Sequence, residues 1–121
     1  MPESIQLTVV TPERMLVRED VESVEVPGKA GYLGILPGHA AFVGQLGTGI
    51  LTYAADGQRR YLALSGGFVE VLPGQVRVLA DVAERAEDID VPRARAALAR
   101  APDDPAKARA AARIAAAERD K

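Results

Sequence analysis

Residues 51–79 read LTYAADGQRRYLALSGGFVEVLPGQVRVL, and two turn signals in this segment predict the architecture of the first part of the chain. Asp56-Gly57 lies between the apolar runs 51–54 and 61–64, which is a strong signal for a β-hairpin. Pro73-Gly74 separates the runs 68–72 and 76–79 in the same way, and Gly after Pro favours a tight turn. Two successive hairpins predict antiparallel β-structure.

The residues before this stretch extend the same pattern toward the N-terminus. Ile5, Leu7 and Val9 alternate with polar residues, which is the period-2 pattern of a half-buried strand. A similar alternation around Val24 and Val26 ends at Pro27-Gly28. Many short strands separated by turns predict a sandwich or barrel in this half of the chain.

The composition changes near Glu87. All eleven Gly precede it, and thirteen Ala lie between positions 93 and 117, with Arg as their main companion. Ala and Arg are strong helix formers. We therefore predict a β-domain over residues 1–87 and a two-helix domain over residues 88–121.

Two helices are predicted in this second part, over 91–101 and 105–119. Asp90 is the expected N-cap of the first, with Pro92 tolerated in its first turn, and Pro102 ends it. Asp104 is the expected N-cap of the second helix, with Pro105 at its first helical position. The short link favours an antiparallel pair.

These helices have few side chains with which to form a core of their own. Val91, Leu98 and Ile114 are the large aliphatic residues that they carry. A first helix of about 10 residues is shorter than the ~12–15 at which isolated helices become marginal in water. We expect the pair to depend on docking and to be mobile.

Composition excludes several classes of protein. The chain has no Cys, which excludes disulfides, thiolate metal sites and a Cys nucleophile. Residues 1–87 carry a net charge of −4 and residues 88–121 a net charge of +2, which suggests two surfaces with different partners. No aromatic residues interleave with the basic tail, so nucleic acid is a poor candidate. With neither a signal-like start nor an apolar span, we expect a soluble cytoplasmic protein.

The sequence offers no catalytic constellation. His39 is the single histidine, and no second His or Cys exists to complete a metal or acid–base site. Ser65-Gly66-Gly67 is not a nucleophile elbow, because the position two residues before the Ser is Ala63. The Gly-rich run 28–38 lacks the Lys-Ser/Thr ending of a P-loop. We predict a protein that is not an enzyme.

Two groups of charged residues remain open to interpretation. The acidic cluster is either a cation site or a solvated stretch before a helix N-terminus. The tail arginines are either a solvated helix face or ligands of an acidic partner or a phosphate. The cluster consists of Glu84, Glu87, Asp88 and Asp90, and the arginines are Arg93, Arg95, Arg100, Arg109, Arg113 and Arg119.

Three stretches carry a family resemblance. They are GYLGILPGHA at residues 31–40, LSGGFVEV at 64–71 and VLADVAERAEDID at 78–90. Together, in this order and followed by a helical pair, they resemble the epsilon subunit of bacterial F-type ATP synthases over essentially the whole chain.

The resemblance implies a β-sandwich of about ten strands followed by a helical hairpin. It implies a central-stalk subunit at the cytoplasmic face of the bacterial cell membrane, bound peripherally through the complex. The sandwich would be held by the gamma subunit and rest on the c-ring. The hairpin would either fold against the sandwich or extend toward the catalytic α/β subunits, where it would inhibit ATP hydrolysis.

The resemblance also places a turn that faces the c-ring, with Gly31, Tyr32 and His39 as its residues. Many relatives have an acidic residue where this chain has Tyr32, whereas His39 keeps the family identity. The tail after Arg100 is shorter than in many relatives, which shortens the reach of the second helix.

Some family members bind ATP through a motif of the form I/L-D-x-x-R-A, which residues 89–94 match. No cofactor is required, but ATP is expected as a regulatory ligand of the folded hairpin. The residues expected to bind it are Glu84, Ile89, Asp90, Arg93, Ala94 and Arg100, joined by Arg109 or Arg113 from the second helix. Arg93 and Arg100 are seven apart and so share one helix face.

Two other readings compete with the stalk subunit. One is a free-standing β-sandwich module whose tail folds on binding a partner. The other is a small hydrolase, which the lack of a nucleophile–base pair disfavours.

Overall fold

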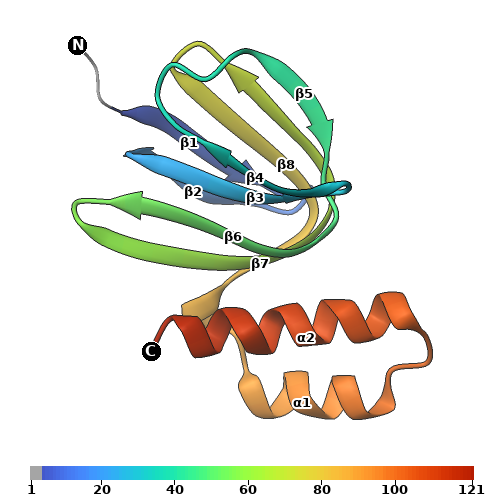
Figure 1. The fold of residues 1–121 in the computed structure, drawn as a ribbon. Helices are drawn as coiled ribbons and strands as arrows, with labels where there is room; N and C mark the ends of the chain where they lie inside the picture. The colour runs from blue at the N-terminus through green and yellow to red at the C-terminus, as the bar shows by residue number, and fades with distance from the viewer. Residues whose placement is uncertain (1–3) are drawn as a thin grey trace.

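The computed structural model describes residues 4–121, and over this range the chain forms eight strands, one short 3-10 helix and two α-helices (Figure 1). One hydrogen-bonded sheet runs in the order β2-β1-β8-β7-β6-β3-β4, and β5 pairs with β7 beside this path. The elements are β1 (Ile5–Val10), β2 (Met15–Val21), β3 (Ser23–Gly28), β4 (Gly31–Ile35), β5 (Phe42–Gln45), β6 (Thr48–Ala55), β7 (Gln58–Leu72), β8 (Gln75–Arg85), the 3-10 helix η1 (Ala86–Asp88), α1 (Val91–Arg100) and α2 (Asp104–Arg119).

The sheet curls into a sandwich because β7 and β8 are long and bend together. The first half of β7 pairs with β6, and the second half pairs with β5. Gly66 and Gly67, with φ values of 73° and 109°, lie between the two halves. Only glycine adopts such angles readily, so the ribbon turns here, and β7 pairs with β8 on both sides of Gly66.

The predicted fold class is confirmed, but the strand count differs. We expected about ten strands, and the described chain has eight. The runs 61–64 and 68–72 were expected as separate strands. They belong to the single strand β7, because its ladder with β8 runs through the glycine bend.

Both predicted hairpin turns are present. Asp56 and Gly57 connect β6 to β7 with φ values of 53° and 76°, the left-handed pair that a two-residue hairpin turn requires. Pro73-Gly74 connects β7 to β8, and Gly74 has a φ of 73°. The turn residues therefore set the register of the β6–β7–β8 meander.

The sandwich encloses one aliphatic core. Ile5, Leu7 and Val9 of β1 are 2%, 0% and 0% exposed, as their alternation predicts. The core cluster draws only on residues between positions 5 and 80, so neither helix contributes to it.

Tyr53 joins opposite parts of the sandwich. Its hydroxyl donates a 3.0 Å hydrogen bond to Oε1 of Glu19, which links β6 to β2. Burial raises the pKa of Tyr53 to about 12, and the hydrogen bond to Glu19 and the charge of that carboxylate add to the effect.

Both helices begin on aspartate caps followed by proline, with small shifts from the predicted bounds. Asp90 caps α1 by accepting a 3.1 Å hydrogen bond from the Arg93 amide, as expected. Asp103, and not Asp104, caps α2, because its carboxylate accepts from the Ala106 amide at 2.9 Å. Pro105 tolerates this one-residue shift, since the first helical turn needs no donor from it.

The first helix ends at Arg100, one residue before the predicted end at Ala101. Ala101 is extended, with φ −60° and ψ 126°. The following Pro102 disfavours the helical conformation for the residue before it. The two helices form the predicted antiparallel pair (Figure 1).

The helical pair packs on the outer face of the sheet through α2, and α1 lies on the far side of α2 (Figure 1). A second apolar cluster fills this junction. Its sheet side is formed by Ile50 and Ala63, and most of the helix side is alanine. Within residues 4–121, no helix is long and apolar enough to cross a membrane.

Candidate functional site

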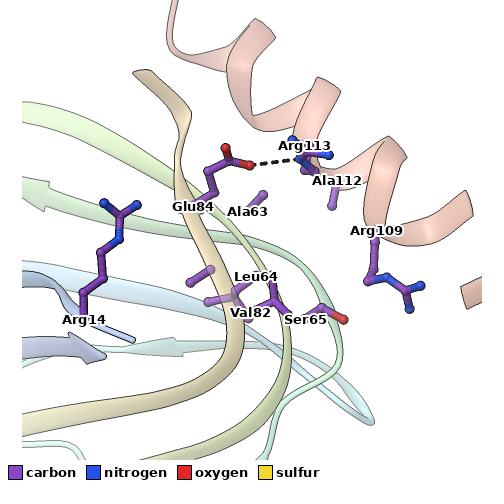
Figure 2. A pocket seen from close by; sticks show the side chains of 10 residues that line it. Arg14, Ala63, Leu64, Ser65, Val82, Glu84, Arg109, Ala112 and Arg113 are labelled. Carbon is purple, nitrogen blue, oxygen red and sulfur yellow. Dashed lines mark hydrogen bonds and ion pairs between the residues drawn. The ribbon is translucent and has the colours of Figure 1, made fainter. Parts of the chain in front are cut away.

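A cavity of about 380 Å³ opens where α2 passes over the middle of β7 and the C-terminal end of β8 (Figure 2). Its apolar walls come from the two strands, and its charged groups come from β8, α2 and the turn between β1 and β2. The lining residues are Arg14, Ala63, Leu64, Ser65, Val82, Ala83, Glu84, Arg109, Ala112 and Arg113.

One ion pair spans this cavity. Nε of Arg113 donates to Oε1 of Glu84 at 2.9 Å, and the two side chains are 29% and 28% exposed (Figure 2). Partial burial reduces screening by solvent, so this contact is stronger than an ion pair on an open surface. Among residues 4–121, it is the ion pair that links the sheet to the helical pair.

Two other arginines lie at the cavity. Arg109 is one helical turn before Arg113 and therefore shares its face of α2. Its guanidinium points away from Glu84 (Figure 2). Arg14 approaches from the opposite side of β8 (Figure 2). The cavity thus combines three guanidinium groups and one carboxylate with an apolar wall, which suits a ligand that has both anionic and apolar parts.

The structure brings together only part of the predicted ATP-binding set. Glu84, Arg109 and Arg113 line the one cavity. Asp90, Arg93 and Arg100 are exposed residues of α1 or its cap and do not line it, because α2 lies between α1 and the sheet.

The two apolar members of that set have packing roles in this arrangement. Ala94 is 0% exposed and Ile89 is 9% exposed, and both belong to the cluster beneath the helices. Asp90 uses one carboxylate oxygen as the α1 cap. The motif at residues 89–94 therefore serves as a helix start in this state of the protein.

The residues predicted to face the c-ring lie at opposite ends of β4. Gly31 and Tyr32 begin the strand, and the Tyr32 hydroxyl accepts a 3.0 Å hydrogen bond from the Ile50 amide. His39 follows the strand, donates from Nδ1 to the Ala40 carbonyl at 2.9 Å and packs 5.5 Å from the Phe42 ring. The structure does not bring these residues into one group.

Other candidates from the sequence find structural explanations. The Ser65 hydroxyl is hydrogen-bonded to the Thr48 hydroxyl at 2.7 Å. Asp88 of the acidic cluster accepts from Arg85, and Glu84 accepts from Arg113. In the part of the chain that the structure describes, no group of three or more His, Asp or Glu side chains could hold a metal ion.

Sequence reasoning missed two arginines near this junction. Arg14 lies in the turn between β1 and β2, about 70 positions before Glu84 in the sequence, and no local sequence pattern predicts that it lines the cavity. Arg85 donates hydrogen bonds to the Leu16 carbonyl and to Asp88. The alternation of side chains along its strand predicts which face of the sheet it lies on, but not these partners. Both depend on how β2 lies relative to the end of β8.

Comparison with known proteins connects this architecture to one family. The family described as "ATP synthase, Delta/Epsilon chain, beta-sandwich domain" matches residues 4–86. The ATP synthase epsilon chain of Solibacter usitatus is 60% identical over 100 residues, which cover 83% of this chain and 75% of that protein. The epsilon chain of Carboxydothermus hydrogenoformans is 52% identical over 101 residues, 84% of this chain and 75% of that one.

The fold comparison agrees with the sequence comparison. A chain in the cryo-EM structure of the Euglena gracilis mitochondrial ATP synthase, which contains OSCP, F1 and the c-ring, superposes with a TM-score of 0.68. It is 28% identical, and the match covers 94% of this chain and 77% of that chain. With its sandwich, its helical pair and relatives named as bacterial epsilon chains, this chain belongs to the delta/epsilon family of ATP synthase subunits as an epsilon subunit.

Proposed function

We propose that this chain is a non-catalytic rotor-stalk subunit that couples the gamma subunit to the c-ring and restrains ATP hydrolysis through its helical pair. The observation that carries the regulatory half is the composition of the α2–sheet junction. The helix side of that junction is mostly alanine, and one partly exposed ion pair adds to it. Each buried methyl contributes only about 0.8 kcal/mol, so the helices are held by a contact that can be released.

A row of exposed apolar side chains supports the partner half of the proposal. Phe68 pairs with Leu79, Leu79 with Val10, and Val10 with Met15, so the row crosses four adjacent strands. Phe68, Leu79 and Met15 are 49%, 48% and 51% exposed. Such a row on one face suits a partner subunit, and we assign it to gamma.

The residues expected to face the c-ring lie at two different ends of β4, so we assign them to two different contacts. The tip that contains Gly31 and Tyr32 is our candidate for the c-ring. His39, at the other end of β4, would face a different surface of the assembly. The location that follows is peripheral, at the cytoplasmic face of the bacterial cell membrane.

Regulatory ATP would use the cavity between α2 and the sheet. Arg109 lines this cavity and would meet phosphate oxygens, and Arg113 would join it with the guanidinium nitrogens that Glu84 does not hold. Arg93 and Arg100 would join only if α1 moved relative to α2. Calorimetry on the intact chain tests this: Arg109→Ala should weaken ATP binding by at least roughly tenfold. No heat at millimolar ATP would contradict the ATP site.

The central experiment compares ATP hydrolysis by the assembled enzyme with and without residues 88–121. We expect the shortened chain to leave proton coupling intact and to raise hydrolysis. A full-length Arg59→Ala variant, changed at an exposed sandwich position, is the matched control. Unchanged hydrolysis after truncation would remove the regulatory half of the proposal, and loss of assembly would support a role of the helices in binding.

A further inference from the structure

The last two residues of β8 hold different parts of the molecule. Neighbouring side chains in a strand point to opposite faces. Glu84 therefore reaches α2 through Arg113, whereas Arg85 points the other way. The Arg85 Nη1 donates to the Leu16 carbonyl at 2.8 Å, and its Nε donates to Oδ2 of Asp88 at 3.1 Å.

The Leu16 carbonyl is available because the β1–β2 pairing is irregular there. Val9 pairs with Val17 and Val10 pairs with Met15, so Leu16 has no partner in the register. Such a bulge takes one residue out of the ladder. The planar, forked guanidinium of Arg85 fits this geometry, because it presents donors in two directions at once.

Arg85 thus connects β2 to the 3-10 turn that follows β8. Residues 86–88 form that turn, and the Ile89 amide donates to the Ala86 carbonyl at 3.2 Å. Ile89 and Asp90 are both extended, with φ and ψ of −79° and 126°, and of −81° and 99°. Two extended residues therefore lie between a clamped turn and the start of α1.

We propose that Arg85 is a positioning residue that clamps residues 86–88 to the sandwich, so that the helical pair pivots at Ile89 and Asp90 when it leaves the sheet. This inference rests on the releasable helical pair of the proposed function. Release breaks the Glu84–Arg113 contact but leaves the Arg85 contacts with Leu16 and Asp88 in place. The clamp limits the directions in which the helices can depart.

Amide hydrogen exchange on the intact chain tests this proposal, because two amides report on the two sides of the pivot. The Ile89 amide reports on the clamped turn, and the Ala94 amide, bonded to the Asp90 carbonyl at 2.9 Å, reports on α1. Arg113→Gln should accelerate exchange at Ala94 but leave Ile89 within about twofold, since Ala94 is 0% exposed and belongs to the apolar cluster at the junction that release opens. Arg85→Gln should accelerate Ile89 roughly tenfold.

Two further variants complete the design. Arg18→Gln makes the same charge change at an exposed position of β2 and should leave both amides unchanged. Arg85→Lys keeps the charge but presents one ammonium in place of the fork, so Ile89 should still exchange several-fold faster. Arg85→Lys also tests the clamp if Arg85→Gln does not fold.

The outcomes separate the clamp from the function it rests on. The clamp is wrong if Ile89 exchange is unchanged in both Arg85 variants, if Arg85→Lys behaves as the parent chain, or if Arg113→Gln accelerates Ile89 as much as Ala94. An unchanged Ala94 in Arg113→Gln would instead contradict the releasable helical pair, while the Arg85 variants would still decide the clamp.

Discussion

Glu84→Gln should shift the helical pair from the docked to the undocked position. The Arg113 Nε to Glu84 Oε1 distance is 2.9 Å, and both side chains are a little over a quarter exposed. A charge-assisted hydrogen bond of this kind contributes roughly 1.5–3 kcal/mol when buried. Exposure reduces that value toward about 1 kcal/mol. We therefore expect about a fivefold change in the docking equilibrium.

A distance measurement between the sandwich and α2 detects this shift. The chain has no cysteine, so single cysteines placed at the exposed positions Lys29 and Lys107 can be labelled without side reactions. Glu84→Gln should increase the fraction of molecules with a long distance between the labels, and higher salt should do the same to the parent chain.

Controls make this result interpretable. Glu70→Gln breaks an ion pair with Arg77 in the sandwich and should not change the label distance. Because the two partners form one contact, Glu84→Gln combined with Arg113→Gln should resemble either single change. Additive effects, or a distance distribution unchanged by Glu84→Gln, would refute the idea that this ion pair holds the helices.

Three further predictions concern the sandwich. Residues 1–87 alone should unfold cooperatively with mostly β circular dichroism, because no helix residue belongs to the core; a broad, non-cooperative melt would contradict this. The folded-state pKa of Tyr53 is raised from 10.0 to about 12, so its stabilising effect is complete below pH 10 and lost as pH rises to 12. Between pH 9 and pH 12, denaturant titrations should show the parent chain losing about 2 kcal/mol more unfolding free energy than Tyr53→Phe. An equal loss in both chains would exclude this role for Tyr53. Gly67→Ala should cost about 2–4 kcal/mol of unfolding free energy, because Gly67 has φ 109° and an added Cβ would meet the Leu79 backbone, whereas Gly57→Ala, in an open turn, should cost less.

Local chemistry explains which parts of the fold the sequence predicts. Asp56-Gly57, Pro73-Gly74 and the Asp90 cap act within a few residues of themselves, so their structures follow from their own conformational preferences. The strand count was wrong for the opposite reason. Whether a glycine pair ends a strand or bends it depends on the partner strand, and β8 pairs with β7 on both sides of Gly66.

The candidate site was predictable only in part. Arg109 and Arg113 stand one turn apart on one helix, so their common face follows from helix geometry alone. The rest of the site depends on which helix packs against the sheet. This choice decides that Glu84 meets Arg113, that α2 separates Arg93 from the cavity, and that Arg14 reaches the cavity. Alanine-rich sequences such as these carry little information about that choice, because alanines lie on every side of α2 and mark no single packing face.

The bend at Gly66 and Gly67 has a mechanical consequence. Since β7 and β8 run through both layers and pair on both sides of Gly66, the layers share a continuous two-stranded spine in addition to the core between them. Such a spine resists shear, so a lateral force applied to the exposed apolar row, which crosses β7 at Phe68 just beyond the bend, reaches the part of the sheet beneath α2. In the rotor-stalk role that we propose, this stiffness would transmit torque through the sandwich, and the proposed pivot at Ile89 and Asp90 would leave the motion of the helices separate from it.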